Sequence, residues 1–127
     1  MTITGGCLCG AIRFSAEGLP RRITHCHCDT CRRAVGAVVA TFATFERRFV
    51  TWRGEPARYE SSEKAWREFC PACGTSLSFN YRPSAARVFI SVGTFDDPSV
   101  MAAGFHDFRH NKIPWLSVDE HLPDSPH

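Results

Sequence analysis

The stretch His25–Cys31 reads His-Cys-His-Cys-Asp-Thr-Cys, so that Cys26, Cys28 and Cys31 crowd into little more than one turn of backbone. That spacing allows all three sulfurs to aim at a single point. Three thiolates around one point indicate a metal site, and zinc is the default ion because it prefers tetrahedral sulfur and nitrogen coordination. Three protein ligands leave a fourth position open for chemistry, unless His25, His27 or Asp29 fills it and the zinc is structural.

The other four cysteines form two short pairs, a glycine-bracketed Cys7-x-Cys9 and Cys70-Pro-Ala-Cys73 followed by Gly74. A Cys-Pro-x-Cys motif also occurs in thiol-disulfide oxidoreductases, where it begins a helix. Here a strand-like pattern follows instead, which favours a zinc knuckle. A knuckle supplies two ligands, so we predict one closed, structural zinc on Cys7, Cys9, Cys70 and Cys73, and two zinc ions in all.

Length and composition indicate a single domain over residues 1–127, because 127 residues with 43% hydrophobic content can bury a core. We expect a cytoplasmic protein that does not enter a membrane, since the sequence shows neither a secretory leader nor an apolar run of spanning length. In a reducing compartment, clustered cysteines bind metal more often than they form disulfides.

The alternation of polar and apolar residues predicts a mostly β chain of short antiparallel strands joined by hairpin-like turns. One short helix is expected from Asp97, an N-cap before Pro98, to about Ala102 or Ala103. The predicted strands are Ala11–Ala16, a short one through Ile23, Val38–Phe45, Phe49–Trp52, Arg58–Ser61, Ala65–Phe69, Ser76–Tyr81, Arg87–Val92, Phe105–Arg109 and Ile113–Val118.

Charge is unevenly placed, since Arg21–Arg58 holds eight arginines and three acidic residues while the whole chain carries only +2. This basic section surrounds the central cysteines and suits a small anionic ligand. Arg32 and Arg33 are candidates for binding a carboxylate of that ligand. The low net charge and the absence of a long basic tail argue against strong nucleic-acid binding.

Together these motifs resemble the glutathione-dependent formaldehyde-activating enzyme family, which includes centromere protein V. The resemblance implies coiled antiparallel sheets with zinc knuckles and at most one short helix. It also implies a structural zinc on the outer four cysteines and a second zinc on Cys26, Cys28 and Cys31. Its motifs are Gly6-Cys7-x-Cys9-Gly10, Cys26 to Arg33 with Gly36, Cys70-x-x-Cys73-Gly74, Gly93 to Pro98, His106, Trp115 and Leu122-Pro123.

The activity implied by this resemblance is a carbon–sulfur lyase reaction that joins formaldehyde to the glutathione thiol as S-hydroxymethylglutathione, or a related thiol–aldehyde adduct. A zinc with an open position suits this chemistry, because it can hold and deprotonate a thiol. His27 and Asp29 are candidates for proton transfer. The alternative hypothesis is a non-catalytic, zinc-stapled binding module. The oligomeric state does not follow from the sequence.

Overall fold

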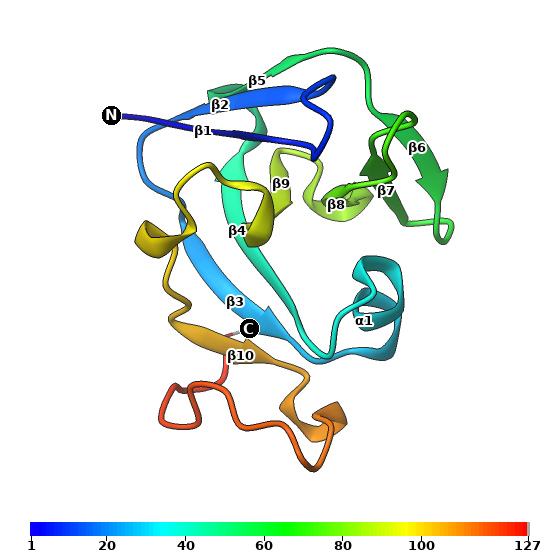
Figure 1. The fold of residues 1–127 in the computed structure, drawn as a ribbon. Coiled ribbons are helices and arrows are strands. Elements are labelled where there is room, and N and C mark those ends of the chain that lie inside the picture. The colour runs from blue at the N-terminus through cyan, green and yellow to red at the C-terminus, as the bar shows by residue number, and fades with distance from the viewer. Residues whose placement is uncertain (127) are drawn as a thin grey trace.

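The computed structural model describes residues 1–126 as two packed β-sheets with one α-helix at their edge (Figure 1). The α-helix, α1, covers Asp29–Val35. The strands are β1 (Thr2–Gly6), β2 (Arg13–Glu17), β3 (Arg22–Cys26), β4 (Ala40–Glu46), β5 (Val50–Arg53), β6 (Ala57–Glu60), β7 (Ala65–Phe69), β8 (Ser76–Tyr81), β9 (Arg87–Ser91) and β10 (Phe105–Asp107). Short 3-10 turns lie at Arg47–Phe49, Arg82–Ser84, Val92–Thr94, Pro98–Val100 and Arg109–Asn111.

The smaller sheet has the order β1-β2-β5, and its alternating apolar residues pack on the larger sheet. Phe14 of β2 meets Phe95 edge to face, with ring centroids 5.1 Å apart. From the larger sheet, Phe45 and Ile90 join this core and are almost completely buried. Burial of these large side chains is the main stabilising contribution of the interface between the sheets.

The larger sheet has the order β10-β3-β4-β9-β8-β7-β6, and only the β10–β3 pair is parallel among the described strands. Its strand β4 carries apolar residues on both faces. On β4, Ala43 and Phe45 face the core between the sheets, whereas Phe42 packs with the cysteines near α1. The second face of this sheet is therefore available to build a site.

The predicted mostly β fold with coiled sheets and one short helix is confirmed, although the helix lies elsewhere than expected. The segment after Asp97 begins as predicted, with the Asp97 carboxylate accepting a hydrogen bond from Ser99 N–H (3.2 Å). It ends after a single 3-10 turn, because Met101 leaves the helical conformation and is buried in the core. The α-helix instead begins at Asp29, where its seven residues are too few to show a helical period.

The predicted strands differ from the observed ones in two further places. Ile113–Val118 is not a strand but a turn, in which Leu116 N–H donates to the Ile113 carbonyl (3.0 Å) and the Lys112 ammonium donates to the Leu116 carbonyl (2.6 Å). Pro114 within it cannot donate to a β-ladder. The first strand, Thr2–Gly6, was not predicted. The predicted Ala65–Phe69 and Ser76–Tyr81 match β7 and β8.

Candidate metal centres and the adjoining cavity

Three cysteines meet where β3 passes into α1. Cys26 ends β3, Cys28 is the residue before α1 begins, and Cys31 lies in its first turn. Their three sulfurs lie within 4.8 Å of one another, and the Sγ atoms of Cys26 and Cys28 are 3.4 Å apart. Four sulfurs around a zinc at about 2.3 Å are separated by about 3.8 Å. The trio therefore matches three corners of such a tetrahedron and could hold a metal ion.

Local backbone chemistry sets this geometry. Cys28 is extended (φ −67°, ψ 150°), and its sulfur accepts a hydrogen bond from Cys31 N–H (3.4 Å), as an N-cap side chain does. The helix ends at Gly36, whose φ of 70° is a left-handed conformation that glycine adopts without a steric penalty. Because this turn is so short, Cys31 is held beside Cys26 and Cys28.

The crowding of the sulfurs changes their acidity. Hydrogen bonds with Cys26 and Cys31 lower the pKa of the Cys28 thiol. The hydrogen bond that the Cys26 thiol donates to Cys28 raises the pKa of Cys26, because this bond stabilises the protonated form. From the opposite side, Arg67 Nη2 lies 3.6 Å from Cys31 Sγ. A thiolate on Cys28 and a guanidinium at Cys31 are electrostatic features typical of a metal-binding or reactive sulfur site.

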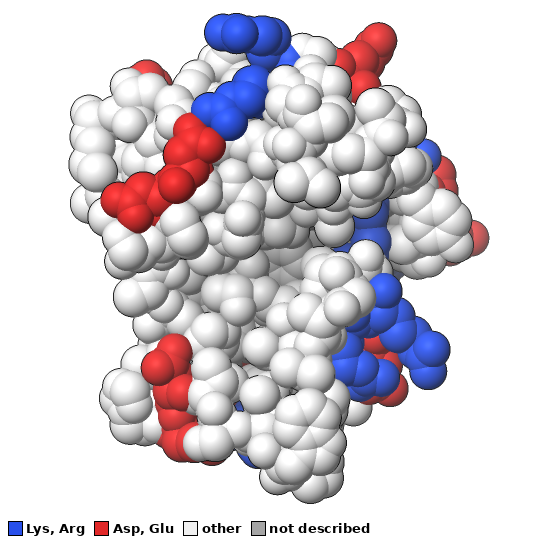
Figure 2. Space-filling model, viewed as in Figure 1, with Lys and Arg blue, Asp and Glu red and all other residues white. Residues whose placement is uncertain are grey.

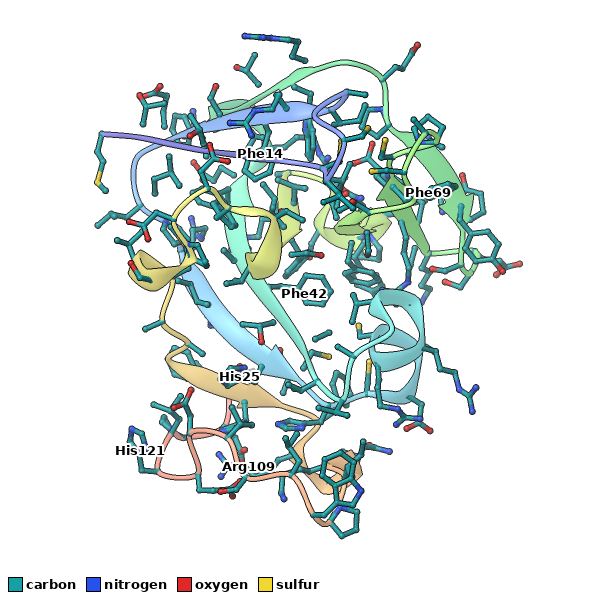
Figure 3. The ribbon with its side chains drawn as sticks, in the orientation of Figure 1. Phe14, His25, Phe42, Phe69, Arg109 and His121 are labelled. Carbon is teal, nitrogen blue, oxygen red and sulfur yellow. The ribbon has the colours of Figure 1, made fainter. Side chains whose placement is uncertain are left out.

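A cavity of about 600 Å³ opens beside these sulfurs, on the face of the larger sheet that turns away from the small sheet. Figure 3 shows Phe42 between β4 and α1, with sulfur atoms near the start of the helix. The lining includes all three cysteines, four arginines, four phenylalanines and several hydroxyl groups. A cavity of this size with a few convergent polar groups is typical of a small-molecule site.

The second cysteine group, Cys7, Cys9, Cys70 and Cys73, also has its four sulfurs within 4.8 Å of one another. Cys9 Sγ is 3.7 Å from Cys7 Sγ and 3.8 Å from Cys70 Sγ, the separations of a tetrahedral site. Backbone N–H groups point at the sulfurs, from Ile12 to Cys7 (3.2 Å) and from Cys73 to Cys70 (3.4 Å). This group could hold a metal with four protein ligands, and none of its members is among the residues that line the cavity.

The knuckle at Cys70 closes through Gly74, which has φ 82° and donates its N–H to the Cys70 carbonyl (2.8 Å). The Thr75 hydroxyl, 3.2 Å from Cys73 Sγ, and the Thr75 backbone lower the pKa of Cys73 to about 5. A strand, β8, follows this knuckle instead of the helix that a thiol oxidoreductase motif would begin.

The histidines proposed as a fourth ligand make hydrogen bonds of their own, although Nδ1 of the buried His27 has no partner among the described residues. His25 contacts the Thr41 hydroxyl through Nδ1 (2.7 Å) and the Asp119 carboxylate through Nε2 (2.8 Å). His27 is 1% exposed, and its Nε2 lies 2.8 Å from Nδ1 of His106. The Nε2 of His106 donates to the Asp119 carbonyl (2.8 Å), so its Nδ1 accepts from His27. Burial lowers the pKa of His27, and His106 adds to this effect.

His106 and Asp119 were missed as members of this cluster. The parallel pairing of β10 with β3 places His106 beside His25, and Asp119 reaches His25 from the turns that follow β10. The available signal in the sequence was the alternation from Phe105 onward, which predicts a strand but not its partner. His27 N–H also donates to the Asp107 carbonyl (3.0 Å), so β10 holds the backbone between Cys26 and Cys28.

The remaining predicted residues lie on α1. Asp29 accepts a hydrogen bond from Arg32 (3.0 Å), and Arg33 is exposed. Figure 2 shows lysine and arginine atoms gathered over the α1 region, on the lower right of the view. Neither Asp29 nor these two arginines is among the residues that line the cavity, and their roles stay predictions. The cavity's own arginines, which the sequence did not single out, are Arg21, Arg22, Arg67 and Arg87.

The two packed sheets carry two cysteine centres. One centre has four cysteines, and the other has three and opens to a cavity. This combination defines a class of β proteins built around two cysteine sites. The pattern of the family described as "Glutathione-dependent formaldehyde-activating enzyme" matches residues 2–111. The chain belongs to this family.

The chain is also similar to two individual proteins. The chain is 34% identical over 91 residues to an uncharacterized lyase of Schizosaccharomyces pombe, a match that covers 72% of this chain and 66% of the relative, slightly under two thirds of the relative's length. It also resembles a crystal structure of a Rhodobacter sphaeroides protein, with a TM-score of 0.62 and 21% identity over 96% of this chain and 99% of the other. At that identity the likeness concerns the fold. The described helix is too short and too polar to span a membrane.

Proposed function

We propose that this protein is a zinc-dependent carbon–sulfur lyase that forms or breaks a thiol–aldehyde adduct beside Cys26, Cys28 and Cys31. The observation that carries the proposal is the contrast between the two centres. The four-cysteine group supplies four ligands and lies away from the cavity, whereas the three-cysteine group supplies three and lines it. Closed sites of the first kind are structural, and sites with an open position are catalytic.

When bound, zinc would supply a position where a substrate thiol loses its proton and is held as a thiolate. In the forward direction a carbon–sulfur bond forms at the aldehyde carbon, the carbonyl π bond breaks, and the proton from the thiol ends on the oxygen. No oxidant or further reactant is needed. The family description supports glutathione as the thiol and formaldehyde as the aldehyde, and the lyase name of the fungal relative supports the class of reaction.

The chain's own residues would mainly bind and orient. The Arg67 guanidinium, 3.6 Å from Cys31 Sγ, stabilises negative charge on sulfur at the wall of the cavity. Thr30 lines the cavity with its hydroxyl 3.4 Å from Cys28 Sγ. His27 and Asp29 are kept as predictions for proton transfer, but the hydrogen bond of the buried His27 to His106 favours a positioning role for His27. A cytoplasmic location is supported by seven cysteines that are all free.

Zinc stoichiometry and adduct kinetics test this proposal together. Protein purified without chelator is expected to hold two zinc ions, and Cys28→Ala is expected to hold one while staying folded. The wild type should speed the exchange between free and thiol-bound formaldehyde, measured by exchange NMR with glutathione, and Cys28→Ala should not. The matched control is Cys9→Ala, at the other centre, which should lose folded protein.

Two results would decide against the enzyme. If the fully metallated wild type leaves the exchange rate of every thiol tested unchanged, the lyase proposal is lost. If, in addition, the protein shifts duplex DNA or RNA in a salt-dependent manner, the zinc-stapled binding module takes its place.

A further inference from the structure

One row of side chains crosses the larger sheet beneath the cavity. The register pairs Arg22 with Thr44, Thr44 with Phe89, Phe89 with Phe79, and Phe79 with Arg67. All five line the cavity. Residues paired in this way lie on the same face of a sheet, so the row runs as arginine, threonine, two phenylalanines and arginine across β3, β4, β9, β8 and β7.

The middle of the row is an apolar floor. Phe79 and Phe89 have ring centroids 5.6 Å apart, and Phe42 adds a third ring 6.3 Å from Phe79. The Thr44 hydroxyl is the one polar side-chain group within the row between the two arginines. A ligand body with several amide groups would leave some of them without partners above these rings, which weakens its binding. The floor therefore favours an apolar or aromatic body.

The arginines that line the cavity differ in their partners. Arg67 stacks on Phe79 (4.7 Å from its Cζ to the ring centroid) and contacts Cys31. Arg22, at the β3 end of the row, stacks on Phe105 (5.3 Å) and donates to the Pro126 carbonyl (3.4 Å). Arg87 lies two residues before Phe89 on the same face of β9, is exposed, and makes no ion pair with any described residue. Arg87 is therefore the guanidinium group that the cavity offers to a ligand.

The distance between Arg87 and the sulfurs fits an elongated ligand. On β4, Ala40 pairs with Cys26 and Glu46 pairs with Arg87, and these two positions are about 20 Å apart along the strand. The Arg87 side chain can reach several ångströms back over the cavity. A molecule that meets the sulfurs at one end and the Arg87 guanidinium at the other must carry its acidic group well away from its reactive atom.

We infer that the cavity takes a thiol whose aromatic or branched aliphatic body ends in a carboxylate, with the carboxylate at Arg87 and the body over Phe89 and Phe79. The reactive end of this assignment rests on the proposed lyase function. The subsite for an apolar carboxylate rests on the row and Arg87 alone. Bidentate contact with a guanidinium gives the carboxylate orientation as well as affinity.

Calorimetry on the zinc-loaded protein tests the subsite with 4-(mercaptomethyl)benzoate, its neutral amide, and glutathione. The acid should bind at least tenfold more tightly than either of the other two. Arg87→Gln should reduce the ratio of the Kd of the amide to the Kd of the acid to less than threefold. Arg53→Gln, an exposed arginine on the smaller sheet, is the matched control and should leave it unchanged. Equal binding of acid and amide, or tighter binding of glutathione, would overturn the inference.

The sulfur-free pair 4-methylbenzoate and 4-methylbenzamide separates this inference from the lyase proposal. If the acid of this pair binds more tightly and Arg87→Gln removes the difference, the subsite stands even in a protein without lyase activity. If glutathione turns over but the sulfur-free acid has no advantage over its amide, the subsite is lost and the lyase proposal survives. Should Arg87→Gln fail to fold, Arg87→Met provides the same comparison.

Discussion

Arg67 and Cys31, which are 36 residues apart in the chain, meet with 3.6 Å between the guanidinium Nη2 and the thiol sulfur. Arg67 reaches this position because β7 pairs with β8, where Phe79 supports the guanidinium from below. The contact joins the cysteine trio to the far side of the cavity. Arg67 is therefore the side chain that connects the metal centre with the ligand site.

Replacing Arg67 should impair the three-cysteine centre and leave the four-cysteine centre intact. We expect Arg67→Gln to lower kcat/KM for the adduct reaction by about tenfold or more, because a hydrogen bond to a charged sulfur contributes about 1.5–3 kcal/mol. Arg67→Lys should retain part of the activity. Arg58→Gln is the control, since Arg58 stacks on Trp66 away from the sulfurs (4.1 Å). Steady-state kinetics with zinc counted in each variant decide this, and an unaffected Arg67→Gln enzyme would contradict it.

Removal of metal should unfold the protein through the four-cysteine centre. That centre joins the turn after β1 to the knuckle between β7 and β8, and Cys70 is completely buried. Zinc binding to such sites contributes directly to folding free energy. A strong chelator should lower the Tm by more than 10 °C, on the scale of about 4–8 °C per kcal/mol for small domains. Circular dichroism melts measure the effect.

The Cys28→Ala variant provides the comparison for that experiment, because it keeps the four-cysteine centre intact. Its Tm before chelation should lie within a few degrees of the wild type, and chelation should then lower it to the same extent. If wild-type protein keeps its Tm after complete zinc removal, the four-cysteine centre is not the structural element proposed above.

His106 should stabilise the segment that carries the trio. His106→Ala removes the acceptor for His27 Nε2–H inside the protein, and a buried donor without a partner costs about 1–3 kcal/mol. Urea unfolding should show this loss as a lower free energy of unfolding. The zinc at the three-cysteine centre should also dissociate faster into a chromogenic chelator. The exposed His110 is the control, since His110→Ala should change neither quantity. Identical zinc release from His106→Ala and wild type would remove the positioning role.

The ion pair between Arg13 and Asp96 makes a pH-dependent contribution to stability. Arg13 donates to both carboxylate oxygens (2.9 and 2.5 Å), and with the Thr4 hydroxyl it lowers the pKa of Asp96 to about 2. A carboxyl group whose pKa is lower in the folded state stabilises the fold above its unfolded pKa of about 3.8, and this stabilisation is lost as the pH falls toward 2. Since both side chains are over one third exposed, it amounts to about 1 kcal/mol or less.

Asp96→Asn tests that contribution. Urea unfolding should show the variant less stable than the wild type at pH 7, and the difference should shrink at the lowest pH at which both remain folded. Acid release of zinc cancels in this comparison because the two proteins share all their cysteines. A difference that grows as the pH falls would have the wrong sign for this mechanism.

Several features followed from the residues alone because they are local. Cys26, Cys28 and Cys31 lie within one turn, so any backbone that turns there brings their sulfurs together. The alternation in Ser76–Tyr81 defines a half-buried strand wherever its partner lies. The two cysteine groups could thus be separated before the fold was known. The short helix Asp29–Val35 escaped because seven residues around three ligands show no apolar period.

What the sequence by itself determined was the set of sulfur ligands and the mostly β character of the chain, because both depend on residues that are close neighbours along the backbone. Only the tertiary structure decided that Arg67 meets Cys31, that His106 holds His27, and that Arg87 lines the same cavity as Phe89 and Phe79. These contacts depend on strand order and register across seven strands. Register is set by packing of the whole core, so no short segment encodes it.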